Sequence, residues 1–319
     1  MAGFNFDRVV LPDAVETMSN DSNAFDVLCI GHASYDMIFA IDHHPDPDEK
    51  MFADRLFSCG GGPAANAAAT VAKLGCRAAF AGYLGRDVYG DSHLNELREL
   101  GIDSRWLVRG DSPTPVSAIL VKPDGKRALV NFKGSTKALP SHSIDFSGLS
   151  AKIVLFDGHE PHISLDLLAT ANFRATPTLL DAGSLHDGTR ALMDKVTYLV
   201  CSEKFALQVA GDTALALTQL AAIAPVAVVT LGERGLIWRR GSETGAMEAP
   251  MVQAIDTTGA GDAFHGAFAA AISAGLPWSE VLRYASAAGA FCCTLMGART
   301  GLPNLAQLQA LLAGWQPEC

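Results

Sequence analysis

The sequence predicts an α/β fold, in which a doubly wound and mainly parallel sheet carries helices on both faces. Three observations favour this fold class. Uninterrupted apolar runs of four to seven residues recur along the chain, as in parallel strands that are covered on both faces. Strand and helix patterns alternate through the second half of the chain. The 319 residues are 49% hydrophobic and 18% charged, so that a large core can be buried.

The first part of the chain predicts strands and two helices. A polar extension, residues 1–24, precedes a buried strand over Phe25–Ile30 that ends in a turn at Gly31. The segment "PAANAAATVAKLG" predicts a helix, because proline suits a first turn, alanine an interior and glycine the position after the end. "CRAAFAGYLG" is typical of a strand, and "YGDSHLNELRELG" of a helix that ends at Gly101.

Two β-rich segments, about residues 34–60 and 114–132, predict a small separate sheet. The second segment contains a hairpin with its turn at Pro123, Asp124 and Gly125. Both segments are too exposed and too hairpin-like for a central sheet. We therefore expect them to form a small β-sheet lid on the main domain, residues 25–319.

The second part of the chain alternates between buried strands and helices. Strands are expected at "AKIVLFDG", "TPTLLDAG", "VTYLVCSE" and "VAVVTLGERG", and "GLIWRRG" should pair back on the last of them. The C-terminal part predicts three helices, over Ala260–Ala274, Ser279–Thr294 and Asn304–Leu312.

Charge and composition argue against several partners. A net charge of −10 and a pI of about 5.3 leave no basic surplus for nucleic acid. The chain shows no signal-peptide pattern, and no apolar run approaches the roughly 20 residues that cross a bilayer, so no membrane partner is expected. Seven cysteines without a C-x-x-C pair predict reduced thiols and a cytoplasmic location.

The stretch "DTTGAGDAFHGAF", residues 256–268, has the composition of a phosphate site. Gly259, Ala260 and Gly261 can present consecutive N–H groups at a helix start, as an anion hole for phosphate oxygens. Asp262 falls in the first turn, where the helix dipole favours an ionised carboxylate that can take a proton from an attacking hydroxyl. A simpler interpretation is a capped helix start. The chain has no P-loop, and "GAGDAF" is not a G-x-G-x-x-G motif.

Two motifs together resemble the ribokinase-like (PfkB) carbohydrate kinases. "DTTGAGDAFHGAF" resembles the C-terminal signature of that family, and "GGGPAANAAATVAKLG", residues 60–75, resembles its N-terminal signature. The two stand in the right order, and the likeness extends over about residues 25–315. "GGGPAA" and the ending "GARTGLP" resemble the ketohexokinase and sulfofructose kinase branch in particular.

The resemblance implies a role for each matching residue on the acceptor side. Asp262 corresponds to the catalytic base, and the three residues before it to the anion hole. The positions that match sugar-binding residues are Asp36, Gly61, Gly62 and Asn66. Two further substrate contacts are predicted from their places in the chain: Asn131 ends the lid hairpin, and His159 follows a buried strand, where open α/β sheets bind ligands. His265, one turn into the catalytic helix, is interpreted as a packing residue.

The resemblance also implies a nucleotide side. The matching positions are Arg127, Ser202, Thr230, Gly232 and Gly235, with Asp256 and Thr258 at positions that hold a monovalent cation such as K⁺ in several members. Mg²⁺ is expected with ATP, because phosphoryl transfer needs charge neutralisation. One departure concerns the ordering of Mg²⁺: Ser202 and Phe205 stand where many members have the asparagine and glutamate of an N-x-x-E motif.

These features predict an ATP-dependent sugar kinase. Its acceptor is expected to be the primary hydroxyl of a ketohexose or a related sugar, fructose-like or tagatose-like. A nucleoside kinase on the same fold and a catalytically silent sugar-binding protein are the alternatives. A homodimer through the lid is also expected, because a small sheet with one uncovered apolar face is unstable in water and favours association.

Overall fold

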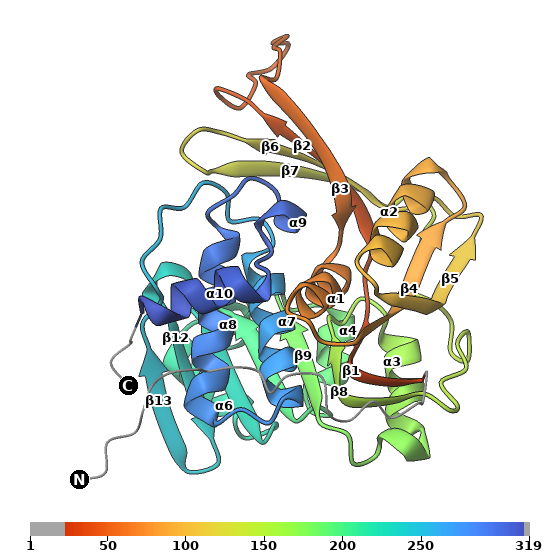
Figure 1. The fold of residues 1–319 in the computed structure, drawn as a ribbon, viewed down its shortest axis with the longest axis vertical. Coiled ribbons are helices and arrows are strands. Elements are labelled where there is room, and N and C mark those ends of the chain that lie inside the picture. Colours follow the sequence, from red (N-terminus) through yellow and green to blue (C-terminus); the bar gives the residue numbers. More distant parts are fainter. Residues whose placement is uncertain (1–22, 316–319) are drawn as a thin grey trace.

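The computed structural model describes residues 23–315 as a main α/β body from which a small sheet projects (Figure 1). Within these residues the main sheet has nine strands, and their spatial order is β13 (Glu243–Met247), β12 (Leu236–Arg240), β11 (Val226–Thr230), β10 (Tyr198–Ser202), β9 (Thr178–Ala182), β8 (Ser150–Phe156), β1 (Ala24–Ile30), β4 (Ala78–Gly85) and β5 (Asp103–Gly110). The strands from β11 to β5 run parallel, and β12 and β13 are antiparallel at one edge. The predicted fold class is confirmed. Residues 1–22 of the predicted extension lie outside the described residues.

Two hydrophobic cores lie on opposite faces of the main sheet. In β8, Ile153 and Leu155 contribute to one core, while Val154 and Phe156 contribute to the other. A strand that is buried on both faces has an apolar side chain at every position. The uninterrupted apolar runs of the sequence are explained by this arrangement.

Helices cover both faces. The first core is covered by α1 (Pro63–Lys73), α2 (Val88–Glu99), α7 (Ala260–Ser273), α8 (Trp278–Cys292) and α10 (Leu305–Ala313). The second is covered by α3 (Pro161–Ala169), α4 (Asp187–Leu192), α5 (Glu203–Ala210) and α6 (Thr213–Leu220). The three predicted C-terminal helices are therefore present with slightly different ends. Among residues 23–315 no helix is both long and apolar enough to cross a membrane.

Helices α1 and α7 pack closely, and this packing sets the geometry of the site. A Cβ on Gly266 of α7 would lie 2.6 Å from the carbonyl oxygen of Ala67 in α1. The alanines of α1 are buried at this contact because only small side chains permit such a close approach. The contact brings the first turn of α1 beside the first turn of α7.

The projecting sheet is the predicted lid. Its strands are β3 (Arg55–Gly61), β2 (Ser34–Ala40), β6 (Val116–Val121) and β7 (Arg127–Phe132), in that spatial order. Residues that pair across a sheet point to the same face, so Asp36, Ser117 and Asn131 share one face. Ile119 and Val121 also belong to this inner face and are both 1% exposed.

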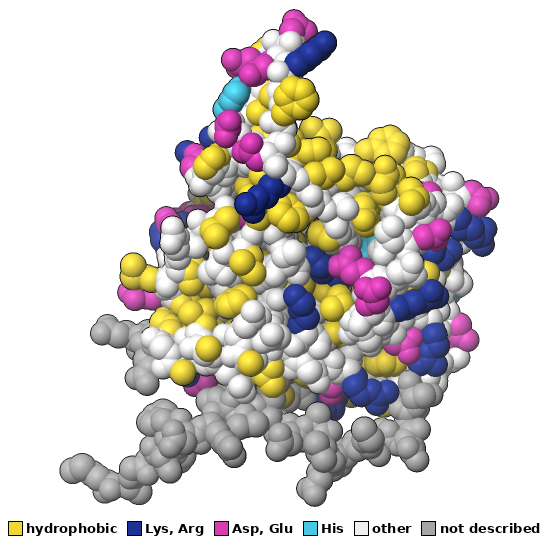
Figure 2. Space-filling model, turned by 45° about the horizontal axis from the view of Figure 1, so that its top comes forward, with side chains coloured by type: hydrophobic (Ala, Val, Ile, Leu, Met, Phe, Trp, Pro, Cys, Tyr) yellow, Lys and Arg dark blue, Asp and Glu magenta, His cyan; other side chains and the backbone are white. Residues whose placement is uncertain are grey.

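The outer face of the lid is apolar and uncovered. Leu56, Val130 and Phe132 are 60%, 67% and 58% exposed. Leu120 belongs to the same face, since its partner in β7, Ala128, lies two positions from Val130. Figure 2 shows hydrophobic side chains gathered on the projecting lid.

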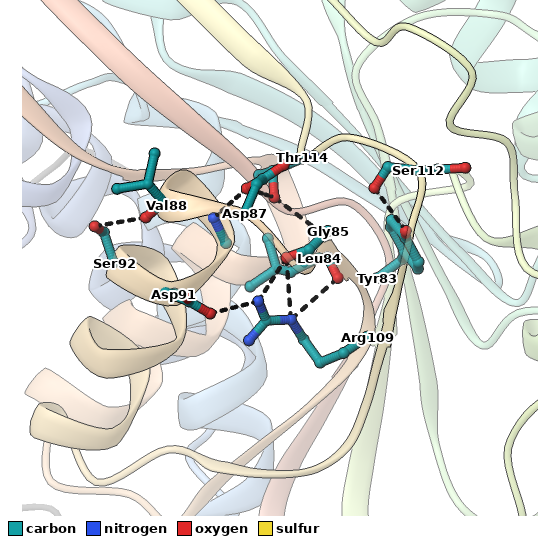
Figure 3. A network of polar contacts seen from close by, with 11 residues as sticks. Tyr83, Leu84, Gly85, Asp87, Val88, Asp91, Ser92, Arg109, Ser112 and Thr114 are labelled. Atoms are coloured by element: carbon teal, nitrogen blue, oxygen red, sulfur yellow. Dashed lines mark hydrogen bonds and ion pairs between the residues drawn. The ribbon is translucent and has the colours of Figure 1, made fainter.

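A polar network fixes the point where the chain leaves β5 for the lid (Figure 3). Asp87, before α2, accepts hydrogen bonds from the N–H and the hydroxyl of Thr114, each at 2.7 Å. Arg109 donates to the carbonyl oxygen of Gly85 and to the carboxylate of Asp91. Tyr83 donates its hydroxyl to the carbonyl of Ser112 at 2.8 Å. The connection from β5 into the lid is thus held against the body by side chains of β4, β5 and the start of α2.

Three elements were not predicted: β5, β13 and the short helix α9 (Ala298–Gly301). The sequence of β5, "DSRWLVRG", carries three charged residues, and β5 lies at an edge of the sheet where such residues reach solvent. Helix α9 is held by Arg299, whose guanidinium donates to the carbonyl oxygens of Gly60 and Ala65. Such long-range contacts leave no local sequence pattern.

Candidate active site

The predicted catalytic aspartate and the predicted sugar-binding asparagine are in direct contact. Asn66 donates its side-chain amide to Asp262 Oδ2 at 2.7 Å. Asn66 is 3% exposed, and its Oδ1 atom is buried without a hydrogen-bond partner in the described part of the chain. A buried acceptor without a partner is unfavourable unless a ligand fills the role. The geometry therefore leaves an acceptor for a substrate hydroxyl beside the carboxylate.

The two glycines of "GAGD" serve different purposes. Gly259, the residue before α7, has a φ of 79°, and a Cβ there would lie 2.5 Å from the Cβ of Ala298. Gly261 is exposed, and a Cβ on it would meet no atom within 4 Å. Because the first N–H groups of a helix have no intrahelical acceptor, the space beside Gly261 suits the approach of an anion.

Asp36 and the glycines at the end of β3 form the opposite wall. Asp36 is 5% exposed and accepts the hydroxyl of Ser34 at 3.0 Å. A Cβ on Gly61 would lie 2.2 Å from Asp36 Oδ2. Gly62 has a φ of 95°, and a Cβ there would lie 2.5 Å from the carbonyl oxygen of His32. Backbone with little bulk thus borders a buried carboxylate, as a sugar site requires.

The pKa values of both carboxylates are raised. Burial raises the pKa of Asp262, while the hydrogen bond from Asn66 and the charge of His265 act in the opposite direction. Burial also raises the pKa of Asp36, and the charge of Asp262 adds to the increase. A general base works best when its pKa is close to the operating pH, so the raised pKa of Asp262 suits a proton acceptor.

Two buried aspartates of this site were not predicted. Asp157, at the end of β8, accepts three backbone N–H groups: those of His32 at 2.7 Å, Ala64 at 3.1 Å and His159 at 2.8 Å. Asp181, at the end of β9, is 6% exposed. Both follow buried strands, in "LFDG" and "LLDAG", and the carboxyl ends of parallel strands were the signal that could have identified them.

His265 is buried, as the packing interpretation predicts, but it also makes polar contacts. Its Nδ1 atom lies 2.6 Å from the carbonyl oxygen of Gly261 and 3.3 Å from Asp181 Oδ2. Its Nε2 atom lies 3.2 Å from the carbonyl oxygen of Val200. Burial raises the pKa of Asp181 to about 7, and His265 acts against the increase. The histidine therefore joins the first turn of α7 to the central strands.

The predicted nucleotide residues lie at the ends of β10 and β11. Ser202 and Thr230 are paired across these strands. The Ser202 hydroxyl donates to the carbonyl of Gly183 and accepts the N–H of Phe205, and the Thr230 hydroxyl donates to the carbonyl of Cys201. Both hydroxyls thus donate to backbone carbonyl groups of neighbouring segments of the fold.

Gly232 and Gly235 shape the short turn after β11. Their φ angles are 62° and 84°, which favour glycine. A Cβ on Gly232 would meet no atom within 4 Å, so that its backbone is open to a ligand. Glu203, near the unmatched N-x-x-E positions, forms an ion pair with Arg234 in this turn, and Phe205 is fully buried.

Arg127 and the predicted cation-binding pair meet at one contact. Arg127 Nη1 donates to the hydroxyl oxygen of Thr258 at 2.7 Å and lies 3.7 Å from Asp256 Oδ1. The same Asp256 oxygen accepts the N–H and the hydroxyl of Thr258, and Asp256 Oδ2 accepts the N–H of Gly297 at 2.8 Å. The lid hairpin is thereby joined to the loop before α7.

The other two predicted substrate contacts differ in their surroundings. Asn131 is exposed on the inner face of the lid, across from Ser117. His159 is stacked on His186, with ring centroids 4.9 Å apart. Among residues 23–315, no group of three histidine, cysteine or acidic side chains is arranged to hold a metal ion.

Comparisons with known proteins agree with this geometry. The profile of the pfkB family carbohydrate kinases matches residues 24–305. The ribokinase of Bacillus subtilis is 26% identical over 292 residues, which cover 90% of this chain and 99% of that protein. A nucleoside kinase of Methanothermobacter thermautotrophicus is 24% identical over 300 residues, which cover 91% and 96%.

A solved structure gives the same result at the level of the fold. The ribokinase of Thermotoga maritima has a TM-score of 0.80 and 27% identity, with 91% of this chain and 99% of that chain covered. The branch suggested by "GGGPAA" stays a prediction. The family profile extends over most of the sequence and includes both motifs, whose residues Asn66 and Asp262 are in contact in the structure. The chain therefore belongs to the PfkB family of carbohydrate kinases, which are phosphotransferases with an alcohol group as acceptor.

Proposed function

We propose that the protein is an ATP-dependent sugar kinase that phosphorylates a primary hydroxyl of a ketohexose or a related sugar. The observation that supports this most strongly is the pair formed by Asp262 and Asn66, with a buried Asn66 oxygen left for a substrate hydroxyl. Ribose is the second candidate acceptor, because relatives include ribokinases, among them an Arabidopsis thaliana enzyme solved with ribose and ATP at 25% identity and a TM-score of 0.78.

In the proposed reaction Asp262 takes the proton of the sugar hydroxyl as that hydroxyl attacks the γ-phosphorus of ATP. The oxygen–phosphorus bond to the leaving ADP breaks, and the N–H groups at the start of α7 stabilise the charge of the transferred group. Asp36 and Asn66 hold the sugar, so that the reacting hydroxyl stays beside the base. Asp262 and the acceptor-binding pair therefore have separable effects on turnover and on sugar affinity.

Mg²⁺ is expected to enter with ATP, since it neutralises phosphate charge when bound. The positions of the N-x-x-E motif do not fit a role in ordering it. Ser202 bonds to the local backbone, and Phe205 is fully buried. No step of the proposed mechanism is assigned to these two positions.

A monovalent cation does not fit beside Asp256 and Thr258 while Arg127 is in place. Both oxygens of Asp256 already accept hydrogen bonds, and the guanidinium supplies the positive charge at the Thr258 hydroxyl. We propose that Arg127 takes the place of that cation and holds the lid against the loop before α7. This contact uses only Nη1 of Arg127, so the other guanidinium N–H groups stay available to a nucleotide phosphate.

We also propose a homodimer through the outer face of the lid. The exposed apolar side chains there include Val130, whereas Ile119 and Val121 point inward and are unsuitable as probes of the interface. Light scattering of the wild type should give twice the 33.5 kDa chain mass. Val130→Glu should reduce it to the chain mass, while Val88→Glu, at an equally exposed valine on α2, should not. A wild type with the chain mass would contradict the proposal.

The proposed function is tested with ATP and a panel of ketoses, aldoses, sugar acids and nucleosides. Sugar-dependent formation of ADP, with the phosphate found on a primary hydroxyl, is the expected result. A preference for nucleosides would contradict the sugar assignment, and binding without turnover would favour a silent sugar-binding protein.

A further inference from the structure

A buried arginine in the short helix α9 lies behind the acceptor side of the site. Arg299 is 6% exposed, and α9 packs against β3 of the lid and against α1 (Figure 1). A guanidinium group stays charged and presents five N–H donors in a fixed plane. Its burial is unfavourable unless these donors find partners. The partners of Arg299 therefore show which parts of the chain this residue holds in place.

The guanidinium binds both ends of one short segment. Its Nε atom donates to the carbonyl oxygen of Gly60 at 3.2 Å, and its Nη1 atom donates to that of Ala65 at 3.4 Å. Gly60 is near the end of β3, and Ala65 is in the first turn of α1. Residues 61–64 between them include the two glycines of the acceptor wall, and Asn66 follows directly. Arg299 thus bridges the lid and the helix that carries Asn66.

Two residues of α2 complete the surroundings of this guanidinium. His93 Nε2 lies 3.0 Å from Arg299 Nη2, and since arginine only donates, the histidine accepts there. Burial and the charge of Arg299 lower the pKa of His93 well below its usual value, which keeps the ring neutral and able to accept. Glu96 Oε1 lies 3.3 Å from Arg299 Nε. The charge of Arg299 is therefore balanced by one carboxylate of α2.

The ion pair between Arg299 and Glu96 also binds both backbone groups of Gly60. Glu96 Oε2 accepts the N–H of Gly60 at 2.6 Å, while Arg299 donates to its carbonyl oxygen. A Cβ on Gly60 would lie 2.3 Å from His93 Cδ2, so only glycine leaves room for the ring. Because β3 is an edge strand of the lid, its outer backbone groups have no strand to pair with. Side chains of α2 and α9 hold the base of that edge instead.

The bridged segment carries part of the acceptor site. Gly61 lies against Asp36, and the N–H of Ala64 donates to Asp157. Asn66, directly after Ala65, donates to Asp262 at 2.7 Å. A misplacement of about 1 Å at a reacting centre can lower a rate by about 10²-fold. A small shift of this segment should therefore affect both the binding of the acceptor and its alignment with the base.

We propose that Arg299 is a positioning residue of the acceptor side. It acts through the carbonyl oxygens of Gly60 and Ala65, and it keeps the glycine segment and Asn66 in fixed places relative to the lid. The inference rests on the proposed function, because it names a further residue for the same acceptor site. It requires no contact of Arg299 with the sugar or with ATP.

The first test removes the guanidinium and keeps an unbranched side chain. In Arg299→Met the KM for the acceptor should rise by about tenfold or more and kcat should fall, whereas the KM for ATP should change by less than about twofold. The acceptor is the compound that the wild type phosphorylates best in the panel of ketoses, aldoses, sugar acids and nucleosides, with fructose and ribose as the first probes. An unchanged KM for the acceptor would overturn the proposal.

Arg283→Met is the matched control. Arg283, on α8, also pairs with an acidic side chain, that of Glu280, and donates to the carbonyl oxygens of Leu312 and Trp315 at the end of α10. Its loss should lower the melting temperature without changing the KM for the acceptor. A rise of that KM in Arg283→Met as large as in Arg299→Met would show a general loss of stability and overturn the proposal.

Arg299→Lys separates position from charge. The lysine keeps a positive charge beside Glu96, and it also keeps the charge that opposes the burial-driven rise in the pKa of Asp36. One ammonium group does not reproduce the planar fork that spans the carbonyl oxygens of Gly60 and Ala65. The KM for the acceptor should therefore stay at least about fivefold above that of the wild type. A lysine variant with the wild-type KM would show that only the charge matters and would overturn the proposal.

A double variant separates position from stability. Arg299→Met leaves Glu96 without its charge partner, and an unpaired carboxylate in such a site is destabilising. Adding Glu96→Gln removes this charge, while the amide oxygen can still accept the N–H of Gly60. The melting temperature should recover in part, but the KM for the acceptor should stay raised. Recovery of both together would make Arg299 a residue for stability alone and overturn the proposal.

The position of the segment is also measured without any substrate, which distinguishes this inference from the proposed function. Hydrogen–deuterium exchange of peptides that cover residues 58–68 should be about tenfold faster or more in Arg299→Met and Arg299→Lys than in the wild type. It should be unchanged in Arg283→Met. If no compound of the panel is phosphorylated, the kinase assignment fails, and the exchange rates still decide about Arg299. Exchange at the wild-type rate in both Arg299 variants would overturn the inference.

Discussion

The acceptor side and the nucleotide side of this site differ in how they are built. Acidic side chains form the acceptor side: Asp36, Asp157 and Asp181 are buried, Asp262 is half-buried, and all four lie at or near the ends of strands or helices. Exposed backbone forms the nucleotide side, where Gly232 and Gly261 have open space beside them.

The difference has a physical consequence. A buried carboxylate that must stay hydrogen-bonded recognises hydroxyl groups in fixed positions, and a wrong ligand leaves it without a partner. A helix N-terminus binds any phosphate that reaches it. Specificity should therefore depend on the side chains of the acceptor side, while the nucleotide is bound mainly through its phosphates. Substitutions on the two sides should have different kinetic signatures.

The largest effect is expected at Asp262. Asp262→Asn keeps the shape and the contact with Asn66 but cannot accept a proton. General-base catalysis typically contributes about 10²–10⁴-fold, so turnover should fall by about 10³-fold. ATP binding and the melting temperature should stay close to those of the wild type. Asp194→Asn, at an exposed carboxylate, is the control. A variant that retains a tenth of the turnover would contradict the role of base.

The second prediction compares the two sides directly. Asn66→Ala removes buried hydrogen bonds that contribute about 1–3 kcal/mol, so the KM for the sugar should rise by roughly 10- to 100-fold, with little change in the KM for ATP. Gly261→Val should do the reverse, because its side chain enters the open space where phosphate is expected while the helical backbone tolerates it. If both variants affect both substrates equally, the division into two sides is wrong.

The sequence predicted the fold class correctly and brought the two site motifs to notice, and the reason is physical. Parallel strands covered on both faces leave uninterrupted apolar runs, and the motifs around Asn66 and Asp262 are local. Tertiary contacts decide the rest. Nothing local to Asp181 or His265 shows that these two residues, which are far apart in the sequence, are in contact. The contact of Arg127 with Thr258 likewise joins two segments that were assigned separate roles.

The third prediction concerns this contact. Arg127→Ala removes the positive charge beside Asp256 and frees the hydroxyl oxygen of Thr258 from its donor, so that a monovalent cation can restore the charge. Activity in tetramethylammonium chloride should fall by about tenfold, equivalent to about 1.4 kcal/mol, and KCl at equal ionic strength should recover part of it. The melting temperature of the variant should also rise with K⁺. The wild type should respond to K⁺ by less than about twofold if the guanidinium replaces the cation. A strongly K⁺-dependent wild type would contradict the proposal.

The smallest effect is expected at His265, where two roles can be separated. His265 lowers the pKa of Asp262 and of Asp181 by its charge, and it bonds to the carbonyl oxygen of Gly261. His265→Asn removes the charge but keeps a donor near the position of Nδ1, whereas His265→Phe removes both.

Without the charge the pKa of Asp262 rises, so a higher pH is needed to ionise the base. The acidic limb of the kcat/KM profile should therefore move to higher pH in both variants, with the loss greatest near the low end of the range. Only His265→Phe should also lower the plateau above that limb, because it alone loses the donor to the carbonyl oxygen of Gly261 in the first turn of α7. A histidine that only packs would be replaced by phenylalanine with little change in the position of the limb, so an unmoved limb in His265→Phe would show that the acceptor side is tuned without it.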